Sequence, residues 1–311
     1  MATYGSVGIV STRWDSSTNR DVFKTLVTEH FNSTDGKALV EWKGLFRDMK
    51  LKDDYERVMR IAGLGGMRKV VEGQGIMLEE PAFGGTKEFT LARYGNGFRI
   101  TDRMKRFNKI GIMKMLTESL KKTMLEGKDI EVMKVYNYPT ATTYAAGFDT
   151  LALAHATHTT LSAQNYSNYA NAALSNAALE TALLYFDTIY DDKGNVMVRI
   201  PKTLLINKSL RFTAAQILKS TNVSGELSNT KNIFPEFDLK TVINHRLSST
   251  TMWYILGDAS DKMFGPRVYT AVEPDLETKD APDRSRDTEV TSHQYFVYGF
   301  TDPRLVYCGK A

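Results

Sequence analysis

The chain contains a single cysteine, Cys308, among its 311 residues. One thiol excludes disulfide bonds within the chain and metal clusters held by several cysteines. The sequence also lacks a run of the roughly 20 apolar residues that span a bilayer. Its first residues have neither the basic stretch nor the apolar core of a secretory signal. We therefore expect no membrane partner and a reducing environment such as the cytoplasm.

Signatures of cofactor and metal binding are also missing. The run Gly63-Leu64-Gly65-Gly66 lacks the lysine and serine of a phosphate-binding loop, so turn glycines explain it better. His155 and His158 lie at i, i+3, whereas a metal-binding pair on a helix lies at i, i+4 and needs a third ligand. We expect these two histidines to be surface or polar-core residues. The turn at Asp191–Asn195 begins like a calcium loop, but Lys202 occupies the position of the final glutamate.

Patterns for acid–base and nucleophilic catalysis are equally weak. Glu79 and Glu80 are adjacent, and on a strand they point to opposite faces, so they cannot act together on one substrate. No GxSxG motif presents a serine nucleophile. Cys308 has no histidine near it in the sequence and is expected to be an inert thiol. The sequence therefore predicts a protein that is not an enzyme and that binds no cofactor or metal ion.

Residues 63–101 are rich in glycine and in residues typical of extended structure. Strands are predicted at Met67–Glu72, Lys87–Ala92 and Gly97–Thr101. Gly84-Gly85 and Asn96-Gly97 supply the positive φ angles that tight turns require. A two-stranded arm of this kind cannot bury both of its faces against its own domain. We therefore expect it to contact a partner, which favours a subunit of an assembly.

A long amphipathic pattern follows from Arg103 to Val135. Asp102 suits the N-cap and the positive end of a helix dipole. Steps of three and four residues predict one apolar face, formed by Met104, Phe107, Ile110, Met113, Leu116, Leu120 and Met124. The pattern predicts a single helix over 103–135, which Gly111 and Gly127 would allow to bend.

Charge is distributed unevenly, although the formal net charge of +4 is too small to indicate nucleic-acid binding. Residues 103–134 carry nine basic and four acidic side chains, whereas 273–289 carry seven acidic and three basic ones. Two surfaces of opposite sign can bring neighbouring subunits into register. The alternative is that both are ordinary solvated faces.

The rest of the chain mixes helices and strands, which favours the α+β class. Before the arm, we expect a helix over Arg20–Phe31, a turn at Asp35-Gly36 and a short helix opened by Asp53 or Asp54. Ser175 is expected to cap a helix reaching Ile189, and Asn207 or Ser209 a helix over Leu210–Lys219. Strands are predicted at 196–200, 203–206, 237–244, 252–256, 269–272, 288–300 and 305–307.

Taken in order, these segments resemble the major capsid proteins of tailed bacteriophages, which have the Hong-Kong-97-type fold. They look most similar to Mu-type major head subunits. The segment PKTLLINKSLRFTAAQIL at Pro201–Leu218, where a strand leads into a helix, is similar to a stretch usual in that family. The resemblance covers nearly the whole chain.

The resemblance implies an α+β phage major capsid fold in four parts. These are an N-terminal arm at 1–62, an extended β-loop at 63–102, a peripheral domain with a long spine helix at 103–144 and 273–311, and an axial domain at 145–272. It also implies a non-enzymatic function. Copies of the chain would assemble as pentamers and hexamers into an icosahedral shell around double-stranded DNA, in virions assembled in the host cytoplasm.

The resemblance also implies partners. The candidate arm begins close to Met1, so we expect a separate scaffolding protein rather than an internal scaffolding segment. A portal, a possible decoration protein and non-specific contact with packaged DNA complete the set. Contacts between subunits are expected at charged residues of the loop, the helix and the acidic segment: Lys69, Lys87, Glu79, Glu80, Arg103, Arg106, Lys114, Lys121, Lys122, Asp275, Glu277 and Asp280.

Two other functions account for fewer of these features. A non-specific nucleic-acid-binding protein would use the basic side chains of 103–134, and its affinity would fall steeply with salt. A hydrolase would need a convergent catalytic pattern, which the sequence lacks. The order of segments therefore favours a capsid subunit.

Overall fold

The computed structural model describes residues 17–33, 40–67, 69–76, 78–107, 109–220, 231–258, 264–280 and 286–311. In the first helix it describes the side chains only at 24, 25 and 27–33. The turn predicted at Asp35-Gly36 lies outside the described residues.

Internal contacts divide the chain into two units. Unit 1 combines the described part of Met1–Ala38 with Tyr94–Leu125 and Pro274–Gln294. Unit 2 combines the described parts of Leu39–Arg93, Glu126–Glu273 and Tyr295–Ala311. The division into an N-terminal arm, a loop, a peripheral domain and an axial domain stays a prediction.

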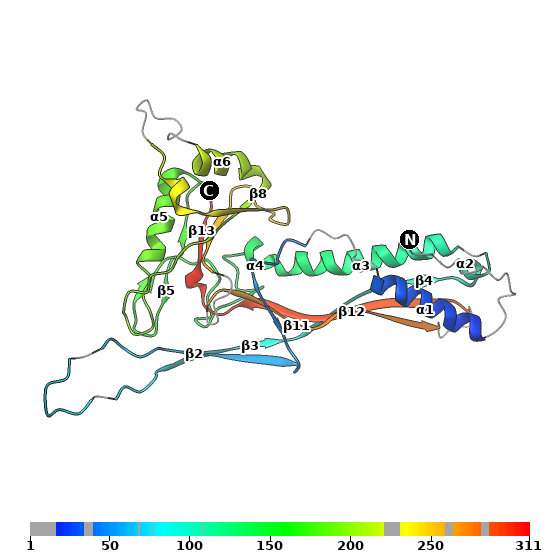
Figure 1. The fold of residues 1–311 in the computed structure, drawn as a ribbon, viewed down its shortest axis with the longest axis horizontal. Helices are drawn as coiled ribbons and strands as arrows, with labels where there is room; N and C mark the ends of the chain where they lie inside the picture. Colours follow the sequence, from blue (N-terminus) through cyan, green and yellow to red (C-terminus); the bar gives the residue numbers. More distant parts are fainter. Residues whose placement is uncertain are drawn as a thin grey trace, which may run out of the picture. The chain divides into compact units, whose positions relative to one another are not determined.

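Helices and strands are mixed along the chain, as expected for the α+β class (Figure 1). The helices are α1 (Ser17–Ser33), α2 (Asp102–Arg106), α3 (Ile110–Val132), α4 (Lys134–Asn137), α5 (Asn176–Asp187) and α6 (Arg211–Lys219), with short 3-10 helices η1 (Lys208–Leu210), η2 (Phe234–Phe237) and η3 (Pro303–Leu305). The strands are β1 (Arg47–Lys50), β2 (Tyr55–Ile61), β3 (Phe83–Thr90), β4 (Ala92–Ile100), β5 (His158–Thr159), β6 (Asn165–Tyr166), β7 (Tyr169–Ala170), β8 (Thr203–Asn207), β9 (Lys240–Asn244), β10 (Trp253–Leu256), β11 (Pro266–Asp280), β12 (Thr288–Phe300) and β13 (Val306–Gly309).

The described residues of unit 1 form an apolar core. Its buried members are Val27 and Phe31 of α1, Ile100 of β4, Met113, Leu120 and Met124 of α3, Leu276 of β11 and Val290 of β12. The helix predicted at Arg20–Phe31 is confirmed as α1, and the strand predicted at 288–300 is confirmed as β12. Val27 and Phe31 of α1 and Met113, Leu120 and Met124 of α3 therefore lie on the buried faces that their periodicity indicates.

The long helix predicted over 103–135 is interrupted, so the prediction of one continuous helix is wrong. α2 ends at Arg106, and α3 begins at Ile110. In a straight helix, each step of three residues turns the apolar pattern by about 60°. Repeated steps of three from Met104 onward would therefore carry it off the core face. The interruption lets both Met104 and Ile110 pack against the same core.

The start of this region also differs from the prediction by one residue. Thr101 is the N-cap, and its hydroxyl accepts a hydrogen bond from the backbone N–H of Met104 at 3.3 Å. Asp102, the predicted cap, is the first residue of α2 and its carboxylate pairs with Arg106 at 2.6 Å. The threonine takes the cap position because its extended backbone precedes the first helical turn.

Phe107 does not belong to the buried face on which its spacing places it. Its side chain is 66% exposed, whereas Met113 is 1% exposed. We expect Phe107→Asp to leave the subunit folded, and Met113→Asp to destabilise it by about 3–5 kcal/mol because an unpaired charge would be buried. Thermal denaturation followed by circular dichroism measures both. An equal loss of stability in the two variants would contradict the assignment of the buried face.

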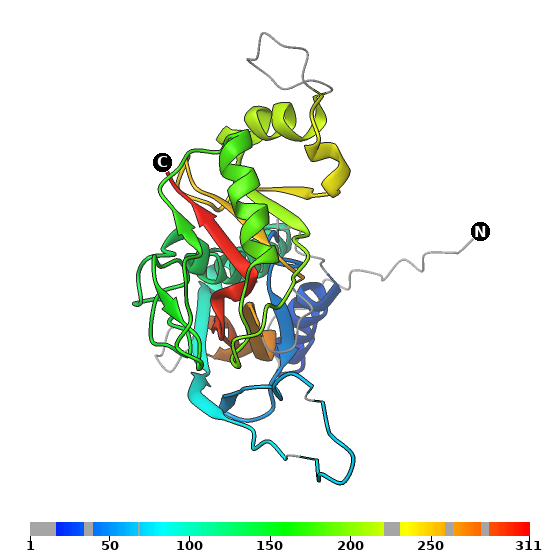
Figure 2. The ribbon, with the colours of Figure 1, turned by 90° about the vertical axis from the view of Figure 1, so that its left-hand side faces the viewer.

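Unit 2 contains a five-stranded sheet with the order β7-β13-β10-β8-β9. The register places Ile206 opposite Trp253 and Leu204 opposite Ile255, so these side chains share one face. α5 and α6 pack on this face and form the largest part of the apolar core. Figure 2 shows α5, in green, crossing in front of the red strand β13. The helix predicted from a Ser175 cap is confirmed, with the serine hydroxyl accepting from Ala178 N–H.

The opposite face of the sheet packs against Tyr136 of α4. The Tyr254 and Tyr136 rings lie 5.1 Å apart, and the Tyr254 hydroxyl donates to the Tyr136 carbonyl. Cys308 lies opposite Tyr254 in the ladder and is fully buried. Burial raises the pKa of its thiol to about 12, so the thiol stays protonated at neutral pH.

Two predictions between 53 and 72 are wrong. The segment opened by Asp53 and Asp54 is the strand β2, not a helix, because its burial alternates with period two and it pairs with β3. Met67–Glu72 forms no strand within its described residues, because no strand among the described residues pairs with this stretch to complete a ladder.

The predicted strand at Val196–Ile200 is also wrong. Val196 forms only an isolated bridge with Tyr190. The backbone N–H groups of Met197 and Arg199 donate instead to carbonyls of Ile189 and Phe186, at the C-terminal end of α5. The segment thus pairs with the end of α5 and the residues just after it rather than with a strand of the sheet.

Candidate functional site: the arm and the charged surfaces

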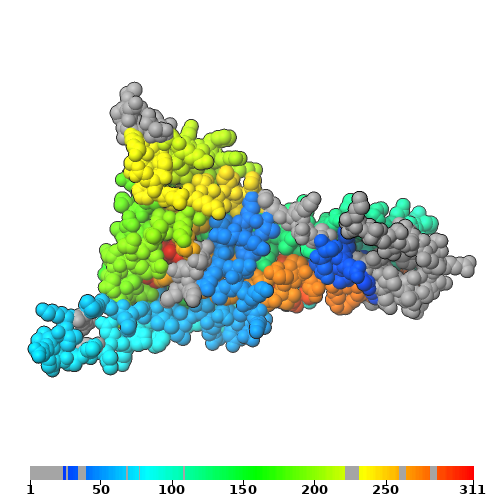
Figure 3. Space-filling model, viewed as in Figure 1, coloured from blue at the N-terminus to red at the C-terminus, as the bar shows by residue number. Residues whose placement is uncertain are grey.

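The most prominent feature of unit 2 is a two-stranded ribbon formed by β2 and β3. The strands are antiparallel, with Tyr55 opposite Thr90 and Ile61 opposite Phe83. Residues 62–82 connect them as an extended loop. We call residues 55–90 the arm and residues 62–82 the arm loop. The arm loop projects away from the rest of its unit, as its cyan atoms show in Figure 3.

Large apolar side chains of the arm loop are uncovered in the single subunit. Met67 and Leu78 are 102% and 93% exposed, and Ile76 and Leu64 are also mostly exposed. A cluster of exposed apolar side chains on a soluble protein marks a surface that another molecule covers. The sequence predicts an arm that needs a partner, and this exposure supports that prediction.

The two adjacent glutamates of the arm loop, Glu79 and Glu80, differ in their contacts. The Glu79 carboxylate accepts a hydrogen bond from Gly65 N–H at 2.7 Å and so joins the two ends of the loop. A Cβ added at Gly65 would lie 2.8 Å from that carboxylate, so the end of the Glu79 side chain would have to shift. Glu80 is exposed. Glu79 therefore shapes the arm loop, and Glu80 remains available for a contact between subunits.

The two lysines predicted in this region also differ. Lys69 is exposed in the arm loop. Lys87 belongs to β3, is half-buried and lies over the Phe89 ring at 5.8 Å. Burial lowers the pKa of the Lys87 ammonium. Lys87 therefore covers the base of the arm with its aliphatic chain.

The arm is attached to unit 2 at its base by an apolar cluster. Phe89 is 2% exposed and packs with Leu51 and Tyr269. The rings of Phe89 and Tyr269 lie 5.2 Å apart. At Gly85 an added Cβ would lie 2.9 Å from the Phe148 carbonyl oxygen, so the ribbon also approaches backbone closely there.

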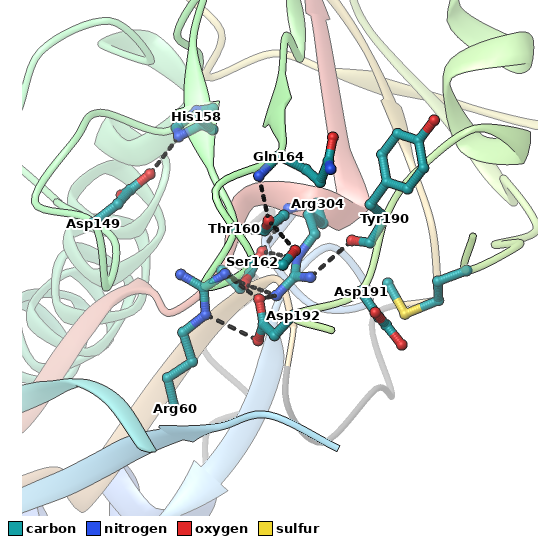
Figure 4. A network of polar contacts seen from close by, with 12 residues as sticks. Arg60, Asp149, His158, Thr160, Ser162, Gln164, Tyr190, Asp191, Asp192 and Arg304 are labelled. Carbon is teal, nitrogen blue, oxygen red and sulfur yellow. Dashed lines mark hydrogen bonds and ion pairs between the residues drawn. The ribbon is translucent and has the colours of Figure 1, made fainter. Parts of the chain in front are cut away.

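A second attachment is a buried network of charged side chains, which Figure 4 shows. Arg60 of β2 donates to both carboxylate oxygens of Asp192, with Nε at 3.0 Å from Oδ2. Arg304 donates to Asp192 at 3.0 Å, to Asp302 at 2.6 and 2.9 Å, and to the Tyr190 carbonyl at 2.9 Å. All four charged side chains are at most 7% exposed. Two arginines and two aspartates make the network electrically neutral.

Asp192 stays ionised inside this network. Burial alone would raise the pKa of its carboxyl group, but the hydrogen bond from Arg60 and the charges of Arg304 and Arg60 outweigh burial and lower it. A carboxylate with a lowered pKa contributes stability above its unfolded value of roughly 4, and that stability is lost as pH falls through the lowered value. The Asp192 carboxylate is therefore charged at neutral pH.

Sequence reasoning missed the members of this network. Arg60 and Arg304 each stand among apolar residues, in VMRIA and PRLVY, which is the one signal that the sequence offers. Asp302 is only two residues from Arg304, but Asp192 is 132 residues from Arg60. Spacing along the chain therefore could not reveal the cluster.

Figure 4 also shows His158, one of the two histidines that we expect to be surface or polar-core residues. His158 is fully buried, and its Nδ1 lies 2.6 Å from an Asp149 carboxylate oxygen. Its ring stacks on Tyr166 at 5.3 Å. Hydrogen bonding to His158 lowers the pKa of Asp149, although burial opposes this effect. A polar-core role is thus confirmed for His158, and His155 is exposed.

The predicted basic side chains of this region are exposed only in part. Lys114 and Lys122 of α3 are exposed, as are Arg103 and Arg106 of α2. Lys121 instead donates to the Phe31 carbonyl at 2.7 Å and lies over the Phe31 ring at 5.1 Å. Lys121 therefore stabilises the subunit itself, which weakens the prediction of a phosphate-binding face.

The acidic segment is likewise engaged in part within unit 1. Asp280 lies 3.4 Å from Lys24, and Glu277 lies 2.7 Å from Lys279. Asp275 is exposed. The attraction between basic and acidic surfaces of different subunits stays a prediction, now limited to the exposed members of each set.

The order of these elements can be compared with known proteins. Residues 84–309 match the family described as phage capsid protein. The chain belongs to the phage capsid protein family. A comparison with curated protein sequences gave no match. In the part of the chain that the structure describes, none of the helices is long and apolar enough to cross a membrane.

Solved capsid structures share the fold of this capsid protein at low sequence identity. The capsid protein of the cyanophage P-SCSP1u aligns with a TM-score of 0.60 and 9% identity, covering 100% of this chain and 92% of that chain. The capsid of an empty GTA particle aligns at 0.53 and 10% identity, over 88% and 92%. The head structure of Helicobacter pylori bacteriophage KHP40 aligns at 0.52 and 11% identity, over 85% and 87%. The predicted α+β phage major capsid fold is confirmed.

Proposed function

We propose that copies of this capsid protein assemble as pentamers and hexamers into an icosahedral shell that encloses double-stranded DNA. The observation that carries the proposal is the arm loop, whose large apolar side chains are uncovered in the single subunit. The occupant that we propose for this surface is a neighbouring copy of the same chain. The role is structural and non-enzymatic.

A neighbouring copy explains both the exposure and the attachment of the arm. Covering apolar surface contributes about 25 cal/mol per Å², so side chains such as Met67 and Leu78 stabilise an interface rather than the subunit. The two attachments of the arm, at the Phe89 cluster and at Arg60, reduce the conformational freedom that assembly would otherwise have to remove. The chain thus presents an ordered arm to its neighbour.

Further partners follow from the same proposal. A separate scaffolding protein would guide the curvature of the shell, and a portal would occupy one vertex. A decoration protein is a possible addition. Packaged DNA would contact the shell without sequence preference, and assembly would take place in the host cytoplasm.

Electron microscopy tests the proposal directly. The chain is expressed alone and together with the scaffolding protein of the same genome, and the products are separated by sedimentation. We expect closed particles of uniform diameter with fivefold and sixfold clusters of subunits. A strictly monomeric protein under every assembly condition would contradict the proposal. Salt-sensitive binding of DNA by that monomer would instead support the nucleic-acid-binding function.

A further inference from the structure

We propose that Arg60 and Asp192 form a latch that sets the direction in which the arm leaves the subunit. The latch is the ion pair between the end of β2 and the turn after α5. Its effect on assembly rests on the proposed function, whereas its effect on the arm does not.

The position of Arg60 in the ribbon is the first argument. Arg60 is the residue before the last of β2, next to the start of the arm loop. Phe89 and its apolar cluster hold the other end of the ribbon. An isolated two-stranded ribbon is only marginally stable in water. Attachments near both ends fix the direction of the ribbon, whereas without the Arg60 pair only the close approaches at Gly84 and Gly85 remain near the loop end.

Close packing around Arg60 is the second argument. Its side chain crosses the ribbon over Gly84, where an added Cβ would lie 3.1 Å from the Arg60 side chain. The same added Cβ would lie 3.1 Å from Leu161, in the loop between β5 and β6. The arginine therefore reaches Asp192 through a narrow passage between the ribbon and the rest of unit 2.

The composition of the network is the third argument. Asp302 and Arg304 already satisfy each other through two hydrogen bonds, and Arg304 also reaches Asp192. Arg60 lies 3.8 Å from the Asp302 carboxylate, too far for a hydrogen bond. The contact that depends on Arg60 is thus the one between the arm and Asp192.

A neutral double variant separates the latch from the stability of the network. Arg60→Met alone leaves one uncompensated aspartate in a buried site, which destabilises the subunit. Arg60→Met with Asp192→Asn restores neutrality, because Arg304 and Asp302 remain paired. We expect the double variant to recover thermal stability relative to Arg60→Met while its arm stays loose.

Hydrogen exchange measured by mass spectrometry on the folded, unassembled subunit reports the arm itself. In the double variant we expect the amides of 58–61 and 83–86 to exchange about tenfold faster than in the wild type. Arg57→Met is the matched control, because the Arg57–Glu88 pair lies on the same ribbon but is exposed. We expect the control to change exchange by less than about threefold.

Assembly then gives a second, separate readout. We expect the double variant to form at least about tenfold fewer closed shells than Arg57→Met, because fewer arms point toward their docking surface at any moment. Unchanged exchange in the double variant would overturn the latch, whatever happens to assembly. Fast exchange with wild-type shell yield would overturn the role of the latch in assembly. Failure of the wild type to assemble would refute the proposed function and leave the exchange result standing.

Discussion

Replacing Leu64–Leu78 by a short glycine–serine linker yields a folded subunit that no longer forms shells; this is the largest effect that we expect on assembly. Among the described residues, the buried apolar clusters of the subunit contain no side chain from this segment. Its removal therefore costs the fold little, while the shell loses the apolar contact that each copy makes with its neighbour. A deletion over Lys69–Lys87 would be unsuitable, because it would remove most of β3.

Sedimentation and electron microscopy measure shell formation, and thermal denaturation measures the subunit. The double variant Met67→Ser and Leu78→Ser should reproduce most of the effect, because it removes two of the most exposed apolar side chains. Lys69→Ser changes an exposed charged residue of the same loop and is expected to assemble nearly normally. If Lys69→Ser blocks assembly while the apolar variants form shells, charge rather than apolar contact governs docking of the arm.

Gly309→Ala is the substitution that we expect to have the largest effect on stability for its size. Gly309 of β13 lies opposite Trp253 of β10, and an added Cβ would overlap the indole ring. Trp253 is fully buried, and its Nε1 donates to the Ala172 carbonyl at 3.1 Å. Because β13 pairs with strands on both sides, its backbone cannot move away. We expect a loss of about 3 kcal/mol, at the upper end for overpacking.

Chemical denaturation of the subunit checks this prediction. Gly111→Ala is the matched control, because Gly111 is exposed in α3 and an added Cβ meets no atom within 4 Å. The control should stabilise the subunit by about 0.5–1 kcal/mol, since alanine is the better helix former. Trp253→Ala is expected to cost about 3–5 kcal/mol. Combined with Gly309→Ala, it should cost less than the sum, because the overlap disappears. Additive losses would contradict the proposed overlap.

Local pattern predicted the elements whose burial follows their own periodicity. The Ser175-capped helix, the strand at 203–206 and the long strand at 288–300 are found where the residues place them. The pattern failed where a partner distant in sequence decides the backbone. Tyr55–Ile61 follows two aspartates suited to a helix cap, yet it is a strand because β3 supplies its hydrogen bonds. Between Arg106 and Ile110 the helix is interrupted, because the interruption allows Met104 before it and Ile110 after it to pack against the same core.

The sequence by itself determined the class of the protein. It showed that membrane-spanning runs and catalytic motifs are missing, and its order of segments indicated a capsid subunit with an arm that needs a partner. Only the tertiary structure decided how the arm is held. Arg60 and Asp192 are 132 residues apart, and Gly309 and Trp253 meet only in the folded sheet. The physical reason is that periodicity reports which side of an element is buried, whereas ion pairs and close packing depend on which distant elements share that buried space.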